Sequence, residues 1–361
     1  MSAPVMIMAG GTGGHVIPAL AVAGALRGRR EVVWLGTERG IEARLVPAAG
    51  YPVEWIEVAG LRGKGAKGWL ASPFTILRAV RQARAALRRR RPGVVLGCGG
   101  FAAGPGGIAA WLSGTPLVIH EQNAVAGLTN RWLSRVAAKV AEGFPGSFPA
   151  RRHAAFVGNP VRPEIAALPP PRERYAARHG PLSLLVIGGS QGSAALNRLV
   201  PEAIGLLPAS RRPAVVHQCG ARHREATEQA YASAGVAAVV CEFIGDMAAE
   251  YANADLVIAR AGASTVAELA AAGVAAILVP FPAAVDDHQT RNAAWLAETG
   301  AAQVVAEAGL TGAELANRIA TLGSGGRAKL TTMAEAARAR AVTDAAERVA
   351  ALCLEAEEAG A

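Results

Sequence analysis

The chain has 361 residues and a formal net charge of +9, from 37 Lys plus Arg against 28 Asp plus Glu. At roughly 150 residues per domain, this length corresponds to about two domains, each large enough to bury its own core. The composition, with 52% hydrophobic and 18% charged residues, 42 Gly and 21 Pro, excludes a disordered polymer, a collagen and a coiled coil.

Short apolar runs followed by Gly-rich turns and Ala-rich helical segments recur along the first half, a pattern typical of parallel βαβ units. The first strand is predicted at residues 5–9, and the turn after it reads GGTGGH at 10–15. Further strands are predicted at 32–35, 94–96 and 117–120. The first half is therefore predicted to form a doubly wound domain.

The turn at 10–15 is suited to anion binding, because backbone N–H groups between a strand and a helix approach phosphate oxygens closely. It is not the dinucleotide fingerprint, since Val16 stands where the third Gly belongs, and no P-loop motif occurs in the chain. His15 ends this turn and could take a hydroxyl proton near neutral pH. A lone histidine also serves in capping or packing, and both roles stay open.

A segment whose charged residues are all basic follows, since no acidic residue occurs from 58 to 120. The basic residues of this window are Arg62, Lys64, Lys67, Arg78, Arg81, Arg84 and the run 88–91. A helix with Ser72 as N-cap and Pro73 at its first position would separate an apolar face, Ile76, Val80, Ala83 and Leu87, from an Arg face, Arg78, Arg81, Arg84 and Arg88. With Trp69, Leu70 and Phe74, it resembles an interfacial membrane contact. A solvated Arg face over a core helix fits equally well.

Two further loops follow strands at the same predicted edge. GCGGF at 97–101 supplies unhindered N–H groups, with Phe101 placed to pack or to stack on a ligand. The stretch 120–123 places His120, Glu121, Gln122 and Asn123 together. Asn123 as a helix cap and His120 as a buried, hydrogen-bonded residue are as compatible with the sequence as direct ligand contact.

Neither secretion nor membrane spanning is indicated. The N-terminus lacks a charged signal-peptide region, and Gly and Pro interrupt the uncharged stretch 92–119, so a transmembrane helix is rejected. The four cysteines are far apart, without a CxxC pair or a zinc-type spacing with His, and are predicted to be reduced thiols.

The segment 157–174 contains five prolines, which are predicted to deny it a helix and to make it an interdomain linker. The boundary is placed near residue 160. The strand pattern then restarts at 182–187, followed by GGSQG, and continues at 214–218, 236–241, 256–259 and 276–280. Ligands of open parallel sheets bind beyond the carboxyl ends of the strands, so two such domains facing each other predict an active-site cleft lined by glycine turns.

The second half carries its own anion-binding candidates. Residues 188–193 open a helix, and their N–H groups with the Ser190 hydroxyl could hold a diphosphate without a metal. Residues 260–268 repeat this arrangement, and Glu268 is placed to accept ribose hydroxyls, although a dipole-stabilising carboxylate would look the same. Arg162 is a candidate phosphate cation. The stretch 286–289 suits sugar hydroxyls or an ordinary loop, and no DxD motif predicts a chelated metal.

Six motifs in one order carry a family resemblance. They are GGTGGH at 10–15, GCGGF at 97–101, HEQNAVAGLTNRWLSRVA at 120–137, GNPVR at 158–162, GGSQG at 188–192, and FIGDM followed by RAGASTVAE. The chain resembles the MurG family of UDP-N-acetylglucosamine transferases, which complete the lipid-linked disaccharide of peptidoglycan. The resemblance implies an α/β GT-B fold of two Rossmann-like doubly wound parallel-sheet domains facing a cleft.

The resemblance also implies domain roles. Residues 1–160, joined by a C-terminal helix within 342–361, would form the acceptor- and membrane-binding domain, and residues 161–341 the UDP-N-acetylglucosamine-binding domain. Ile244 would bind uracil through its backbone, Glu268 the ribose, and Ser190 with Arg162 the diphosphate region. The full implied substrate-binding set is Thr12, Gly13, Gly14, Asn123, Arg162, Ser190, Ile244, Ala263, Ser264, Thr265, Val266, Ala267, Glu268 and Gln289. Two departures are His288, where the family commonly has Gln, and Phe101, where Tyr is common.

The implied reaction is an inverting transfer of N-acetylglucosamine to the C4 hydroxyl of undecaprenyl-pyrophosphoryl-N-acetylmuramyl-pentapeptide, with His15 as general base and with no metal or cofactor. The protein would sit peripherally on the anionic cytoplasmic face of the inner membrane, with cell-wall synthesis proteins as further partners and no nucleic acid. Three alternatives are a glycolipid synthase with a diacylglycerol acceptor, a nicotinamide-dependent oxidoreductase, and a non-catalytic nucleotide-sensing module.

Overall fold

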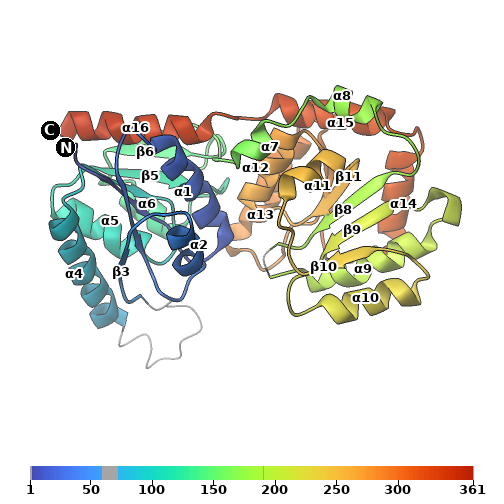
Figure 1. Cartoon of the computed structure of the whole chain (residues 1–361), viewed down its shortest axis with the longest axis horizontal. Helices are drawn as coiled ribbons and strands as arrows, with labels where there is room; N and C mark the ends of the chain where they lie inside the picture. The colour runs from blue at the N-terminus through green and yellow to red at the C-terminus, as the bar shows by residue number, and fades with distance from the viewer. Residues whose placement is uncertain (1, 59–71, 190, 361) are drawn as a thin grey trace. The chain divides into compact units, whose positions relative to one another are not determined.

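The computed structural model describes residues 2–58, 72–189 and 191–360. The chain divides into two compact units (Figure 1). Unit 1 comprises Met1–Val161 and Val342–Ala361, and unit 2 comprises Arg162–Ala341. The predicted boundary near residue 160 lies next to the observed one, and the C-terminal helix belongs to unit 1, the unit with which the sequence analysis grouped it.

Unit 1 is built on a parallel sheet with the strand order β3-β2-β1-β4-β5-β6-β7. Its strands are β1 Val5–Met8, β2 Val32–Gly36, β3 Val53–Trp55, β4 Val94–Gly97, β5 Leu117–Glu121, β6 Lys139–Glu142 and β7 Ala155–Phe156. In the register, Val5 pairs with Val32 on one side and with Val94 on the other. The central strands are buried apolar runs, as expected when both faces of a sheet are covered.

Helices cover both faces of this sheet. They are α1 Gly13–Leu26, α2 Glu42–Ala48, α4 Ser72–Arg90, α5 Ala103–Leu112, α6 Leu128–Leu133 and α16 Ala345–Gly360, with a short 3-10 turn at Ala150–Arg152. Side chains of β1 alternate between two cores: Val5 and Ile7 pack with α1 and α16, while Met6 and Met8 pack with α4 and α5. In Figure 1, α16 accordingly lies beside α1.

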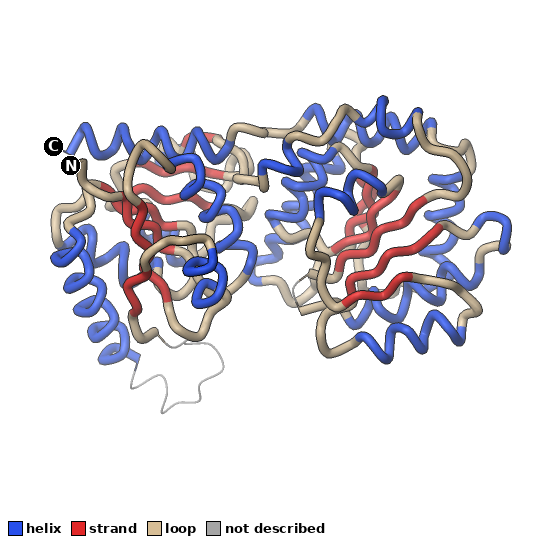
Figure 2. The backbone as a smooth tube through the Cα atoms, in the orientation of Figure 1, coloured by secondary structure: helices blue, strands red, loops and turns tan. Residues whose placement is uncertain are grey.

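Unit 2 repeats the design with the order β10-β9-β8-β11-β12-β13. Its strands are β8 Ser183–Ile187, β9 Ala214–Gln218, β10 Val239–Cys241, β11 Leu256–Ala259, β12 Ala275–Leu278 and β13 Ala302–Val304. Its helices are α7 Pro163–Ala166, α8 Pro171–Ala176, α9 Ala194–Leu206, α10 Arg224–Ser233, α11 Met247–Asn253, α12 Ala263–Ala272, α13 His288–Ala297, α14 Gly312–Gly323 and α15 Ala328–Ala339, with 3-10 turns at Ala209–Arg211 and Val285–Asp287. Figure 2 shows the strands of each sheet in red and the helices that cover it in blue.

The two strand orders confirm the predicted fold class of two doubly wound parallel sheets. In each sheet the order reverses beside its first strand, between β1 and β4 in unit 1 and between β8 and β11 in unit 2. Ligands of such sheets bind at this switch point, just beyond the carboxyl ends of the strands. The loops that follow these four strands are the four glycine-containing loops singled out in the sequence.

The prediction that prolines deny residues 157–174 a helix is wrong. Short helices begin at Pro163 and at Pro171, each proline occupying the first position of its helix. Proline is tolerated there because the first N–H groups of a helix have no intrahelical partner and the fixed φ suits the helix. The prolines therefore start helices in this segment rather than prevent them.

The predicted Arg-faced helix is α4, which begins at Ser72. Val80, Ala83 and Leu87 are buried, and Arg78, Arg81, Arg84 and Arg88 are exposed. Ile76, which was predicted on the apolar face, is 37% exposed, beside the exposed Phe74 and Leu77. Trp69 and Leu70 lie outside the described residues. Within the described chain, no helix is long and apolar enough to cross a membrane.

Candidate functional site

The switch point of unit 1 presents the N-terminus of α1. The helix begins at Gly13, and Thr12 precedes it in an extended conformation without a side-chain capping bond. The first turn of the helix carries no acidic residue. The early backbone N–H groups of a helix lack intrahelical acceptors and carry partial positive charge, so this end is suited to an anion.

The loops after β1 and β4 pack directly against each other. A side chain on Gly100 would clash with the backbone of Gly10, and one on Gly99 would come within 2.8 Å of the His15 ring. Gly99 and Gly100 also have φ values of 93° and 83°, which favour glycine. Glycine at both positions therefore allows the two loops to meet and the imidazole to lie against the second one.

His15 is half-buried, and its ring is tied to the polar stretch after β5. Its Nδ1 lies 3.2 Å from Oε1 of Gln122, and Nε2 of Gln122 lies 3.3 Å from Nδ1 of His120. Nε2 of His120 lies 2.9 Å from the carbonyl oxygen of Gly158. His120 is only 1% exposed, and its burial lowers its pKa. This geometry matches the interpretation of His120 as a buried, hydrogen-bonded residue.

Glu121 organises the loop that carries Asn123. The Glu121 carboxylate accepts hydrogen bonds from the backbone and side-chain amides of Asn123, at 2.9 and 3.2 Å. It also accepts from the backbone of Gly127 and the side chain of Asn130, at 3.0 and 2.8 Å. Glu121 is 3% exposed, whereas Asn123 is half-exposed. Asn123 is thus held by a buried carboxylate at a half-exposed position.

Glu42, a fully buried carboxylate at the start of α2, is not predicted from the sequence. Its Oε2 accepts the backbone N–H of Gly11 at 2.9 Å, and its Oε1 accepts the backbone N–H and the hydroxyl of Thr37 at 3.1 and 2.7 Å. Its described partners are neutral donors. No sequence signal marks this residue, because a Glu near a helix start is usually exposed.

Unit 2 presents the N-terminus of α9 at its switch point. Ser193 caps this helix by accepting the N–H of Leu196 at 3.3 Å. Gly192 packs so tightly on the backbone of Cys219 and Gly220 that a side chain on it would clash. Ser190, a predicted diphosphate ligand, lies outside the described residues.

A buried neutral network lies behind this loop, which the sequence analysis also missed. Asn197 donates to the carbonyl of Cys219 at 3.0 Å and lies 3.0 Å from Nε2 of His217, whose Nδ1 is 2.9 Å from the hydroxyl of Tyr231. His217 is fully buried, and desolvation lowers its pKa to about 4. The backbone of Cys219, on which the glycine loop rests, is therefore held by uncharged side chains.

The second helix N-terminus in unit 2 is that of α12. Gly262 precedes it, the predicted residues Ala263, Ser264, Thr265, Val266 and Ala267 form its start, and no acidic residue lies in the first turn. Glu268 is 8% exposed and accepts Nε and Nη2 of Arg162 at 3.1 and 2.8 Å. Desolvation raises the pKa of Glu268 despite the Arg162 charge. The two predicted residues therefore pair with each other, and Tyr251 donates to the same carboxylate at 3.3 Å.

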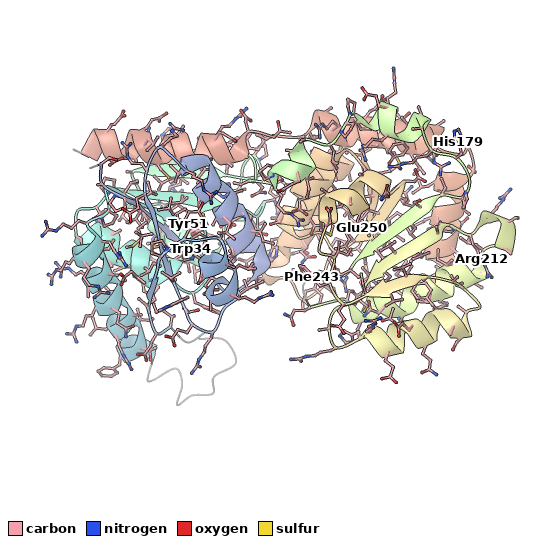
Figure 3. The ribbon with its side chains drawn as sticks, viewed as in Figure 1. Trp34, Tyr51, His179, Arg212, Phe243 and Glu250 are labelled. Atoms are coloured by element: carbon pink, nitrogen blue, oxygen red, sulfur yellow. The ribbon has the colours of Figure 1, made fainter. Side chains whose placement is uncertain are left out.

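Two predicted contacts lie on neighbouring loops of unit 2. Ile244 is buried in the loop between β10 and α11, beside Phe243, which is 67% exposed and is labelled in Figure 3. Gln289 is the second residue of α13, and its Oε1 accepts the backbone N–H groups of Ala261 and Phe281 at 3.2 and 2.9 Å. Gln289 thus joins the loops after β11 and β12, with its carbonyl oxygen occupied. No group of metal-binding side chains is found in the described part of the chain.

Comparison with known proteins places this geometry in a family. The glycosyltransferase family 28 N-terminal and C-terminal domain models match residues 5–142 and 183–349. A UDP-N-acetylglucosamine--N-acetylmuramyl-(pentapeptide) pyrophosphoryl-undecaprenol N-acetylglucosamine transferase of Nitrosococcus oceani is 55% identical, covering 98% of this chain and 99% of that protein. The transferase of the same name from Aeromonas hydrophila is 56% identical, covering 98% and 97%. A crystal structure of Acinetobacter baumannii MurG superposes with a TM-score of 0.83 at 43% identity, covering 98% and 99%.

The chain belongs to the MurG family. Its membership confirms the resemblance read from the six motifs and the GT-B fold class that the resemblance implied. In this MurG-family chain, the glycine loops of both units lie at the switch points where that fold places its ligands.

Proposed function

We propose that this MurG-family protein transfers N-acetylglucosamine from UDP-N-acetylglucosamine to the C4 hydroxyl of a lipid-linked N-acetylmuramyl-pentapeptide. Relatives named for this transfer, with more than half of their residues identical over nearly the whole chain, support the reaction. The observation that carries it is the pair of switch points, each with a helix N-terminus suited to phosphate, and an imidazole beside the first.

We propose that unit 2 binds the donor. The N-termini of α9 and α12 would hold the diphosphate, the backbone at Ile244 the uracil, and Glu268 the ribose. The ion pair with Arg162 supports this role for Glu268, because it fixes the carboxylate and keeps the guanidinium beside the diphosphate region. Asn123 and Gln289 would recognise the sugar, Gln289 through Nε2, since its Oε1 is occupied.

We propose that unit 1 binds the acceptor, with Thr12, Gly13 and Gly14 as contacts at the start of α1. In one displacement, the acceptor C4 oxygen would attack the anomeric carbon, the bond from that carbon to the diphosphate oxygen would break, and His15 would take the hydroxyl proton. The charge that develops on the leaving UDP would be stabilised by the two helix N-termini of unit 2 and by Arg162.

The first experiment measures UDP release by the purified protein with and without the lipid-linked N-acetylmuramyl-pentapeptide. We expect acceptor-dependent release and a disaccharide product by mass spectrometry. We expect His15→Ala to lower kcat by about 100-fold or more while donor affinity is retained, as for loss of a general base. An inert acceptor, with diacylglycerol reacting instead, would identify a glycolipid synthase.

We also propose that unit 1 docks on the anionic cytoplasmic face of the inner membrane. Besides its exposed Arg residues, α4 carries large exposed apolar side chains, as do α5, which packs against α4, and α6, which packs against α5. These side chains are Phe74, Leu77, Ile108, Trp111, Leu112, Leu128 and Trp132. Basic residues near an anionic surface contribute about 1 kcal/mol each, and apolar side chains insert at the interface.

Vesicle cosedimentation tests this docking. We expect Gln substitutions at Arg78, Arg81, Arg84 and Arg88 to weaken binding to anionic vesicles strongly. The matched control replaces four exposed arginines of unit 2, Arg172, Arg198, Arg211 and Arg224, and should leave binding nearly unchanged. Equal vesicle binding by the two variants would instead favour the alternative interpretation, in which the Arg face of α4 is only solvated surface over a core helix.

A further inference from the structure

We propose that Gln122 and His120 are positioning residues that fix the tautomer of His15, with the proton on Nδ1 and the lone pair on Nε2. The three side chains form a hydrogen-bonded relay that ends on the carbonyl of Gly158. The inference deepens the proposed function, because it states which nitrogen of the candidate base is able to accept the acceptor's proton.

The carbonyl of Gly158 fixes the hydrogen-bonding roles along the relay. The carbonyl oxygen of Gly158 can only accept, so Nε2 of His120, at 2.9 Å, must carry a hydrogen. A neutral imidazole has one N–H, so Nδ1 of His120 is then an acceptor. Nδ1 of His120 therefore requires a donor from Gln122.

The orientation of the Gln122 amide in turn determines which nitrogen of His15 carries the hydrogen. Its NH2 group must face His120, at 3.3 Å, so its carbonyl oxygen is the atom 3.2 Å from Nδ1 of His15. That oxygen only accepts, so Nδ1 of His15 must donate. In neutral His15, Nε2 is then left without a hydrogen and is the basic nitrogen.

The relay depends on His120 being neutral. A protonated His120 would donate from both nitrogens, reverse the Gln122 amide and impose the opposite tautomer on His15. His120 is 1% exposed, and desolvation lowers its pKa, against smaller opposing effects of the Gly158 carbonyl and the Glu121 charge. The Glu121 carboxylate is itself occupied by four amide donors. Burial therefore keeps the far end of the relay uncharged at neutral pH.

The surrounding backbone holds the relay in place. The side chain of Asn159 donates to the backbone carbonyl of Gln122 at 2.9 Å, and both residues are buried. Gly158 packs so closely on Val342 that a side chain there would clash. The His15 ring also packs so closely on Gly99 that a side chain there would come within 2.8 Å of it. Orientation and tautomer are therefore set before the acceptor binds, as preorganised catalysis requires.

The direct test is nitrogen-15 NMR of the histidine side chains at neutral pH, with His15→Gln used to assign the His15 signals. We expect the shifts of a protonated Nδ1 and an unprotonated Nε2 for His15, and the reverse for His120. Free imidazole side chains favour the Nε2–H form, so the expected His15 tautomer is diagnostic. An Nε2–H or averaged His15 would overturn the proposal.

A pair of length-matched variants adds a kinetic test. Gln122→Met removes the acceptor for Nδ1 of His15, and we expect the Nε2–H tautomer and a fall in kcat of about tenfold or more, with the donor KM little changed. Gln122→Glu keeps an acceptor for Nδ1, and we expect it to retain the Nδ1–H tautomer and more of kcat. Equal tautomers in both variants would overturn the proposal.

The double variant separates this proposal from the proposed function. In the His15→Ala background, Gln122→Met should lower kcat no further, because the two residues act as one unit. If His15→Ala retained kcat, the role of His15 as base would fail while the NMR tautomer stood. If His15→Ala lost kcat but the wild type showed Nε2–H, the relay would fail and the base would stand.

Discussion

The first glycine loops of the two units have the same place in the same fold but different supports. In unit 1 the loop after β1 is held by the buried carboxylate of Glu42, which accepts the N–H of Gly11. In unit 2 the loop after β8 rests on the backbone at Cys219, which Asn197, His217 and Tyr231 hold without a net charge.

This difference bears on which loop suits a diphosphate. The carboxylate beneath the unit 1 loop occupies the N–H of Gly11, and its negative charge weakens the attraction of this loop for an anion. The support described for the unit 2 loop is neutral and adds no negative charge that would oppose the field of the α9 N-terminus. The comparison supports the proposal that the UDP diphosphate binds unit 2.

The largest expected effect is that of removing the charged support. Glu42→Ala leaves the N–H groups of Gly11 and Thr37 and the Thr37 hydroxyl without acceptors, at about 1–3 kcal/mol per buried group. We expect the free energy of unfolding of unit 1 to fall by about 3 kcal/mol or more. Urea unfolding, monitored by hydrogen exchange of the β1 amides, measures this loss. The exposed Glu38→Ala is the control. Equal stabilities would show that the carboxylate does not hold the loop.

The neutral support should make unit 2 sensitive to acid. Above the ordinary histidine pKa of 6.5, His217 is neutral whether folded or unfolded. As the pH falls toward the folded pKa of about 4, the unfolded chain takes up a proton that the folded chain does not. The stability that comes from burying neutral His217 is therefore fully present above pH 6.5. Acidification removes up to about 3 kcal/mol of it.

Variants of two histidines check this pH dependence. We expect His217→Gln to flatten the fall in unfolding free energy between pH 6.5 and 4. His179→Gln, at an exposed position labelled in Figure 3, should retain the wild-type slope. An unchanged slope in His217→Gln would show that the network tolerates a protonated imidazole.

A smaller effect is expected at the proposed ribose carboxylate. Glu268→Ala removes the partner of Arg162 and of Tyr251, and we expect UDP affinity to fall about tenfold, or about 1.4 kcal/mol, in calorimetry with normal folding. Glu314→Ala, on the exposed surface of α14, should bind UDP normally. Unchanged affinity in Glu268→Ala would leave this carboxylate only a structural role in pairing Arg162.

The smallest effect concerns the residues before the two loop helices. Ser193 accepts the N–H of Leu196, whereas Thr12 makes no side-chain capping bond. We expect Ser193→Ala to cost about 1 kcal/mol of stability and Thr12→Ala a few tenths. Thermal unfolding of the two variants is the measurement, and each serves as the other's control. Equal costs would contradict the assigned capping difference.

Prediction from sequence succeeded for most strands that lie inside each sheet, although the inner strand β6 was missed. The run predicted at 256–259 matches β11, because a strand buried on both faces is a short continuous apolar segment. The run predicted at 214–218 matches β9, although this strand ends in His217 and Gln218. The edge strands β3, β7 and β13 were missed, since they have two or three residues and are largely half-exposed or exposed. Edge strands carry little apolar signal because only part of their surface is covered.

The glycine loops and the six motifs were readable from the sequence, because local backbone geometry between a strand and a helix demands particular residues at particular spacing. The fold class and the family followed from them. Only the tertiary structure decided the partners of the polar side chains: Glu42 beneath Gly11, Arg162 on Glu268, and His15 on Gln122. These pairs lie 31, 106 and 107 residues apart, and hydrogen bonds between distant residues depend on the packing of whole elements rather than on local spacing.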